Sequence, residues 1–160
     1  MVALNPPAAE LGLPYAFASH FAPRQVLQAI DLYRSQFQPS GQLAEPYVVI
    51  GVPLIAAPTD EEAEYLASSN YQRVLGILTG NRRRLQPPVD NFMAGLRPEE
   101  RAAIADFLAA AVIGGPARVH DGLARLVELT QADELMLVCD IYDPELRLRA
   151  LDIAAAAMRA

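Results

Sequence analysis

The side chains with the clearest position for chemistry are four polar residues that each end or follow a short apolar run. Ser19 and His20 stand at the end of the first run, and Asp140 and Tyr142 follow the last. If both runs are strands of a parallel sheet, these residues lie at its carboxyl edge, where α/β proteins bind ligands. His20 then either contacts a ligand or is a solvated residue that caps its loop. These four are our candidates for ligand contact, and no residue stands out as catalytic.

Three further motifs have both a chemical and a structural interpretation. Arg82-Arg83-Arg84 could bind a phosphate, since guanidinium groups suit that geometry, or could be solvated in a loop. The carboxylates after Thr59 are explained by a helix-capping box that ends at Glu62. Gly114-Gly115-Pro116 lacks the Walker spacing and the following lysine of a phosphate loop.

The remaining reactive residue types suggest structural roles. No set of His, Cys, Asp and Glu has metal-ligand spacing, and there is no triad signature. His120 lies beside Asp121 in a predicted helix, which indicates a surface position. Cys139, the single cysteine, ends a predicted buried strand and is expected to pack as a small apolar residue.

Composition narrows the class of protein. The chain has 160 residues, 52% of them apolar, and a net charge of −6. An acidic chain is not suited to binding nucleic acid or an anionic membrane surface. Its apolar runs are far shorter than the roughly 20 residues of a membrane span, and its N-terminus lacks the features of a signal peptide. We therefore expect a cytoplasmic protein with no nucleic-acid or membrane partner.

The order of elements predicts a parallel α/β fold. Strands are expected at 14–19, 47–57 and 134–139, and Pro53 predicts a bulge or an edge position in the second. Helices are expected at 7–12, at 24–37, from Thr59 to about 79, from Pro98 to about 114, at 116–131 and from Pro144 onward. The sequence thus predicts a single domain over 1–160 with a helical insertion at about 80–115.

Several segments resemble a known family, in its order and spacing. They are Ala8–Phe21, Tyr47–Val52 with Ala57–Ala63, Val112–Pro116, and Asp133–Met136 with Ile141–Arg149. These segments resemble the bacterial-luciferase-like flavin-dependent monooxygenases, which are (β/α)8 barrels. The resemblance implies that the three strands are the sixth, seventh and eighth of such a barrel. A full barrel needs about 250 residues, so we expect an incomplete TIM-type barrel, the C-terminal part only.

The resemblance also implies a cofactor and a chemistry. The family uses FMN, with coenzyme F420 as the alternative, to oxidise or oxygenate a substrate. By resemblance, Ser19 and His20 line the flavin ring, and Asp140 and Tyr142 flank the same mouth. The family's hydroxyl-bearing turn for the FMN phosphate has no counterpart in Ala3–Pro7. Two interpretations follow: part of a flavin-dependent monooxygenase, or a non-catalytic barrel remnant that acts as a binding or oligomerisation module.

An opened barrel leaves strand edges and an apolar inner face uncovered. Such edges pair readily with other chains, and large apolar patches usually mark interfaces. We therefore expect a homodimer or higher oligomer in which a partner covers them.

Overall fold

The fold is built on a sheet of four parallel strands. The computed structural model describes residues 7–18 and 25–159. The strands are β1 (Tyr15–Phe17), β2 (Val48–Ala56), β3 (Val112–Gly114) and β4 (Glu134–Val138). β2 is central: β1 and β3 pair with its two ends, and β4 pairs along its middle. The predicted parallel α/β fold is confirmed, with one short strand that the sequence did not reveal.

β2 carries the core because both of its faces are covered. Eight of its nine residues are buried, as expected for a β-branched, apolar run inside a parallel sheet. The predicted bulge or edge at Pro53 is wrong, because β2 is central and its register with β4 is unbroken there. Pro53 lies between Ile50, the last partner of β1, and Leu54, the first partner of β3. The N–H that proline lacks therefore falls between the segments that pair with β1 and β3, so no hydrogen bond of the sheet is lost.

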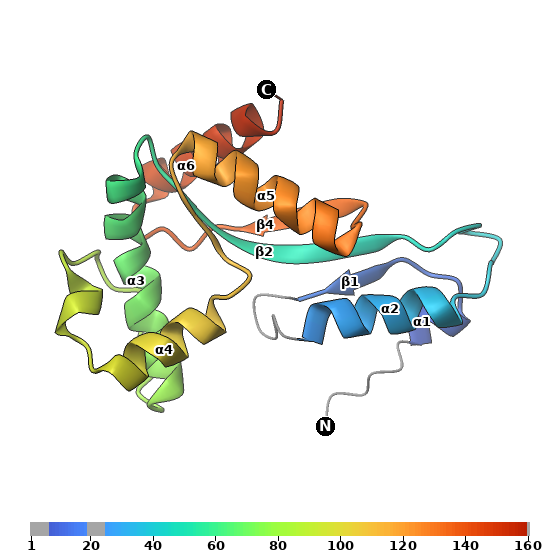
Figure 1. The fold of residues 1–160 in the computed structure, drawn as a ribbon, viewed down its shortest axis with the longest axis horizontal. Helices are drawn as coiled ribbons and strands as arrows, with labels where there is room; N and C mark the ends of the chain where they lie inside the picture. Colours follow the sequence, from blue (N-terminus) through green and yellow to red (C-terminus); the bar gives the residue numbers. More distant parts are fainter. Residues whose placement is uncertain (1–6, 19–24, 160) are drawn as a thin grey trace.

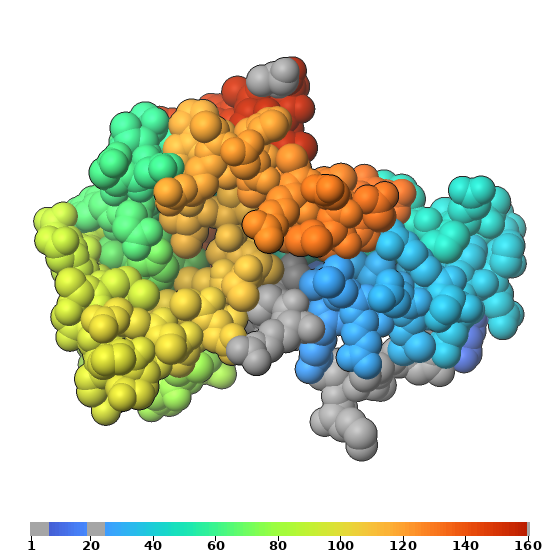
Figure 2. Space-filling model, viewed as in Figure 1, coloured from blue at the N-terminus to red at the C-terminus, as the bar shows by residue number. Residues whose placement is uncertain are grey.

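In the described residues, six α-helices and a short 3-10 helix pack around or beside the sheet. They are α1 (Pro7–Glu10), α2 (Val26–Gln36), α3 (Asp60–Leu78), η2 (Phe92–Gly95), α4 (Pro98–Phe107), α5 (Pro116–Thr130) and α6 (Pro144–Ala157). In Figure 1, α2, α5 and α6 run along the sheet, whereas α3 stands at the end of β2 and α4 packs on it. Figure 2 shows this α3–η2–α4 lobe, in green to yellow, beside the main body.

The helix that begins at Pro98 is shorter than the sequence predicts. We expected it to end near Gly114-Gly115, but α4 ends at Phe107 and the following residues form β3. An alanine-rich stretch is compatible with continued helix, yet Val112 and Ile113 pair with β2 instead. The ladder with a buried strand overrides local helix propensity here.

The other helix boundaries agree with their sequence signals. Thr59 Oγ1 accepts a hydrogen bond from the Glu62 N–H at 3.2 Å at the start of α3. Gly80 follows α3 with φ of +73°, a left-handed conformation that glycine adopts without strain. The Asp143 carboxylate caps α6 by accepting from two backbone N–H groups. Within residues 7–18 and 25–159, no helix is both long enough and apolar enough to cross a membrane.

Candidate functional site

The carboxyl edge of the sheet holds one of the two predicted pairs of site residues. Ser19 and His20 lie outside the described residues. Asp140 follows β4, and its carboxylate pairs with the Arg73 guanidinium of α3 at 3.0 Å. Tyr142 is 47% exposed. The structure therefore joins Asp140 to an α3 residue that sequence reasoning did not select.

α3 carries an unusual run of buried polar residues towards this edge. Ser68, Ser69 and Asn70 are each at most 2% exposed. Asn70 Oδ1 accepts from Nε and Nη2 of Arg73, which orients the guanidinium towards Asp140. Ser69 Oγ has no hydrogen-bond partner among the described residues, and an unsatisfied buried hydroxyl is costly. Three consecutive polar residues inside a predicted helix were the sequence signal that could have revealed this site.

The turn between β3 and α5 does not form a phosphate cradle. The Gly115 N–H donates to Asp60 Oδ1 at 2.7 Å, and the other Asp60 oxygen pairs with Arg118 at 3.1 Å. A phosphate bound at this helix start would have to displace the Asp60 carboxylate from both donors. Asp60 therefore occupies the position that an anionic ligand would need.

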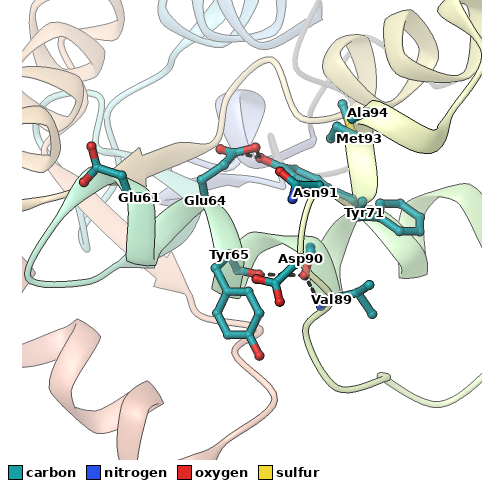
Figure 3. Close-up of a pocket in the computed structure, with 11 residues that line it drawn as sticks. Glu61, Glu64, Tyr65, Tyr71, Val89, Asp90, Asn91, Met93 and Ala94 are labelled. Atoms are coloured by element: carbon teal, nitrogen blue, oxygen red, sulfur yellow. Dashed lines mark hydrogen bonds between the residues drawn. The ribbon is translucent and has the colours of Figure 1, made fainter.

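A hollow of about 360 Å³ opens between the first half of α3 and the segment 89–94. Figure 3 shows side chains from both segments converging on it. Its lining residues are Glu61, Glu64, Tyr65, Ser68, Tyr71, Val89, Asp90, Asn91, Phe92, Met93 and Ala94. Ser68 Oγ donates to the Tyr65 carbonyl and accepts from the Val89 N–H at 2.7 Å. The second of these bonds holds the segment 89–94 against α3.

The strongest electrostatic coupling in this hollow joins Tyr71 to Glu64. The Tyr71 hydroxyl donates to the Glu64 carboxylate, with both oxygens at 3.0 Å (Figure 3). Burial raises the pKa of Tyr71 well above its ordinary range, and the negative charge of Glu64 raises it further. The phenol therefore stays protonated and acts as a hydrogen-bond donor. With Glu61 and Asp90 also on the lining, the hollow suits a cation or a hydrogen-bond donor better than an anion.

The remaining predicted residues have simpler environments. His120 is exposed and its Nδ1 lies 3.0 Å from Asp121 Oδ1, as expected for a surface position. Cys139 is partly buried against the core, and burial raises the pKa of its thiol. No group of three or more His, Cys, Asp or Glu in the described part of the chain could hold a metal ion.

Comparison with known proteins relates this chain to one protein family. The family model for luciferase-like monooxygenases matches residues 6–133. A luciferase-like monooxygenase of Escherichia coli K12 is 39% identical over 147 residues, which are 92% of this chain and 44% of that protein. This chain thus spans less than half the length of this relative.

Solved structures of other proteins have a similar fold over nearly the whole of this chain. The crystal structure of apo-MsnO8 matches with a TM-score of 0.76 and 29% identity, covering 95% of this chain and 46% of that one. The oxygenating constituent of 3,6-diketocamphane monooxygenase from Pseudomonas putida, solved with FMN, matches with a TM-score of 0.54 and 16% identity, covering 96% of this chain and 45% of that one. The second match concerns the fold alone.

Proposed function

Because this chain belongs to the luciferase-like monooxygenase family, we propose that it supplies the C-terminal wall of a (β/α)8 barrel that performs flavin-dependent oxygenation. The observation that supports this most directly is the parallel β1–β2–β4 register together with the close match to apo-MsnO8 over 95% of the chain. In this proposal β1, β2 and β4 are the sixth, seventh and eighth strands. The mouth of the barrel lies at their carboxyl ends, beside Asp140 and Arg73.

FMN is the cofactor we propose for the assembled enzyme. It would supply the oxygen chemistry, as flavins do, and the protein would position it and exclude water. The described residues do not fit the FMN phosphate at the β3–α5 turn, because Asp60 takes the donors there. We therefore assign no step of flavin chemistry to them. The phosphate site would come from residues outside the described ranges or from another polypeptide.

We propose that a second copy of this chain covers the unpaired strand edges. In the described part of the chain, β1 and β4 each pair only with β2, so each has one unpaired edge. Unpaired edges of parallel strands favour association. The competing proposal, a non-catalytic oligomerisation module, rests on the same edges but requires no flavin.

A chimera separates these possibilities. This chain would replace the matching 147 residues of the E. coli relative, and flavin absorbance and oxygen consumption with reduced FMN would be measured. We expect the chimera to bind FMN, and the isolated chain to bind it far more weakly.

Both arms can fail. A folded chimera without flavin, set against an unaltered relative that binds it, would favour the non-catalytic module. FMN binding by the isolated, monomeric chain with the same affinity as the chimera would show that no second polypeptide is needed.

A further inference from the structure

The second half of α3 and the loop after it form a positively charged region on an acidic protein. Between Glu64 and Asp90 the chain has four arginines, Arg73 and Arg82–Arg84, and no acidic residue. The whole chain carries a net charge of −6. This region is therefore positively charged, whereas the protein as a whole is negatively charged.

The loop that carries three of these arginines is fixed along α3. Gly76 allows the Asn81 backbone to approach so closely that an added Cβ would lie 2.7 Å from the Asn81 carbonyl oxygen. Gln72 Nε2 donates to the Pro87 carbonyl at 2.9 Å, and Ser68 Oγ accepts from the backbone further along. Positions 68, 72 and 76 lie on one face of the helix. The loop thus runs back along this face, and Arg82–Arg84 are held at its start.

Two adjoining hollows lie under this loop and share Arg73 and Arg83. One, of about 390 Å³, is lined by Arg73, Ile77, Arg82, Arg83 and Phe107. The other, of about 280 Å³, also includes Arg84 and Phe92 in its lining. We call the two together the arginine hollow. Its lining combines arginines with one aromatic residue in each hollow, Phe107 in the first and Phe92 in the second.

The loop arginines have no anionic partner in the described structure. Neither a carboxylate nor a carbonyl of residues 7–18 or 25–159 pairs with the guanidinium groups of Arg82, Arg83 or Arg84. The C-terminal end of α3 attracts cations through its dipole, which explains a single arginine near Leu78. The helix dipole does not explain three consecutive arginines that line a hollow together with Arg73.

We propose that the arginine hollow binds the phosphate of a phosphate-bearing aromatic small molecule, such as a nucleotide. Guanidinium groups bind phosphate oxygens through paired, charge-assisted hydrogen bonds. Phe107 or Phe92 would contact the base or ring. The site shares Arg73 with the proposed barrel mouth, and because the Arg73 guanidinium is paired with Asp140, the phosphate would bind Arg82–Arg84. Its ligand could be a flavin nucleotide or a nucleotide of another kind, and the experiment distinguishes the two.

The test measures binding by isothermal titration calorimetry to the purified chain, using inorganic phosphate, AMP, FMN and riboflavin as probes. We expect AMP and FMN to bind and riboflavin, which lacks the phosphate, to bind at least about tenfold more weakly. FMN binding without AMP binding would identify a flavin-nucleotide site, and similar binding of both would identify a general nucleotide site. Equal affinity for riboflavin and FMN, or no binding of any phosphate probe at millimolar concentration, would overturn the proposal.

Matched variants locate the site. Arg83→Gln, which alters both hollows, should weaken AMP binding by about tenfold. Arg125→Gln removes the same charge from an exposed position on α5, and should leave binding within about twofold. Equal loss in both variants would show a general charge effect and overturn the proposal. Gly76→Ala provides a second route, since it displaces the loop without removing charge and should also weaken binding. None of these measurements involves flavin turnover, so their failure would leave the proposed enzyme function standing.

Discussion

At the scale of single residues, buried hydroxyl groups hold distant parts of the chain together. Tyr33 is fully buried on α2, and its hydroxyl donates to the Leu13 carbonyl at 2.9 Å while accepting from the Tyr47 N–H at 3.1 Å. It also stacks on Tyr15 of β1. One side chain therefore fixes the segments that enter both β1 and β2. The Tyr71 hydroxyl instead bonds the Glu64 carboxylate within α3 itself.

Replacing Tyr33 with Phe should lower the free energy of unfolding by about 1–3 kcal/mol, because it leaves one backbone donor and one acceptor without their partner. The measurement is urea denaturation followed by circular dichroism. Tyr142→Phe is the matched control, since that hydroxyl belongs to an exposed side chain, and it should change stability by less than about 0.5 kcal/mol. Equal effects in the two variants would contradict the role given to Tyr33.

The Tyr71–Glu64 pair should make stability fall at high pH. Burial first, and Glu64 second, raise the pKa of Tyr71 in the folded protein above its ordinary value of about 10. Above that value the unfolded chain releases the phenolic proton while the folded chain retains it, so the stabilisation present below it is lost as pH rises. Tyr71→Phe should remove this contribution. We expect the difference in the free energy of unfolding between wild type and variant to stay constant below pH of about 9 and to shrink progressively above pH of about 10, towards the raised pKa of the folded protein. A difference that does not change with pH would contradict the assignment.

At the scale of elements, α3 and α6, which follow β2 and β4, each begin at a capping side chain. Asp143 Oδ1 accepts from the Glu145 N–H at 2.8 Å and from the Leu146 N–H at 3.1 Å. At the start of α3 the predicted capping box forms only in part: Thr59 accepts from the Glu62 N–H, while the Glu62 carboxylate pairs with Arg149 of α6. That pairing joins two helices that follow different strands.

Asp143→Ala should therefore destabilise the protein by about 0.5–2 kcal/mol, the usual cost of losing an N-cap. Asp152→Ala, an exposed change within the same helix, is the control for lost charge and should be nearly neutral. Both are measured by thermal unfolding. A similar loss in the control would mean that charge on α6, rather than the cap, stabilises the helix.

At the scale of the whole molecule, the sheet is an arc with two unpaired edges in the described part of the chain. β4 contributes one of them, and Met136 on this strand is 57% exposed. The chain spans less than half the length of these relatives. The proposed association would use the unpaired edges, because such edges pair readily with other chains.

Met136→Lys should shift the association equilibrium of the purified chain towards monomer, because a charged side chain opposes pairing at a sheet edge. Sedimentation equilibrium at micromolar concentration provides the measurement. Met158→Lys, which lies after α6 and is 48% exposed, should have little effect. A wild-type chain that is strictly monomeric would contradict the proposed association.

The sequence by itself determined the parallel α/β fold, the order of the elements other than β3 and η2, and the family. These are encoded locally: the apolar run of β2, the caps at Thr59 and Asp143, and the left-handed glycine after α3 each specify structure within a few residues. The correct prediction of α5, from Pro116 to Thr130, rests on the same kind of signal.

Only the tertiary structure decided which polar residues meet. Arg73 and Asp140 are 67 positions apart, and their pairing depends on how α3 leaves β2 relative to β4. The same holds for β3, where local propensity favoured helix and the buried neighbour β2 offered better hydrogen bonds, and for the arginine hollow, which exists because the loop packs back on α3. Local signals specify conformation, whereas contacts between distant side chains depend on packing that no short segment contains.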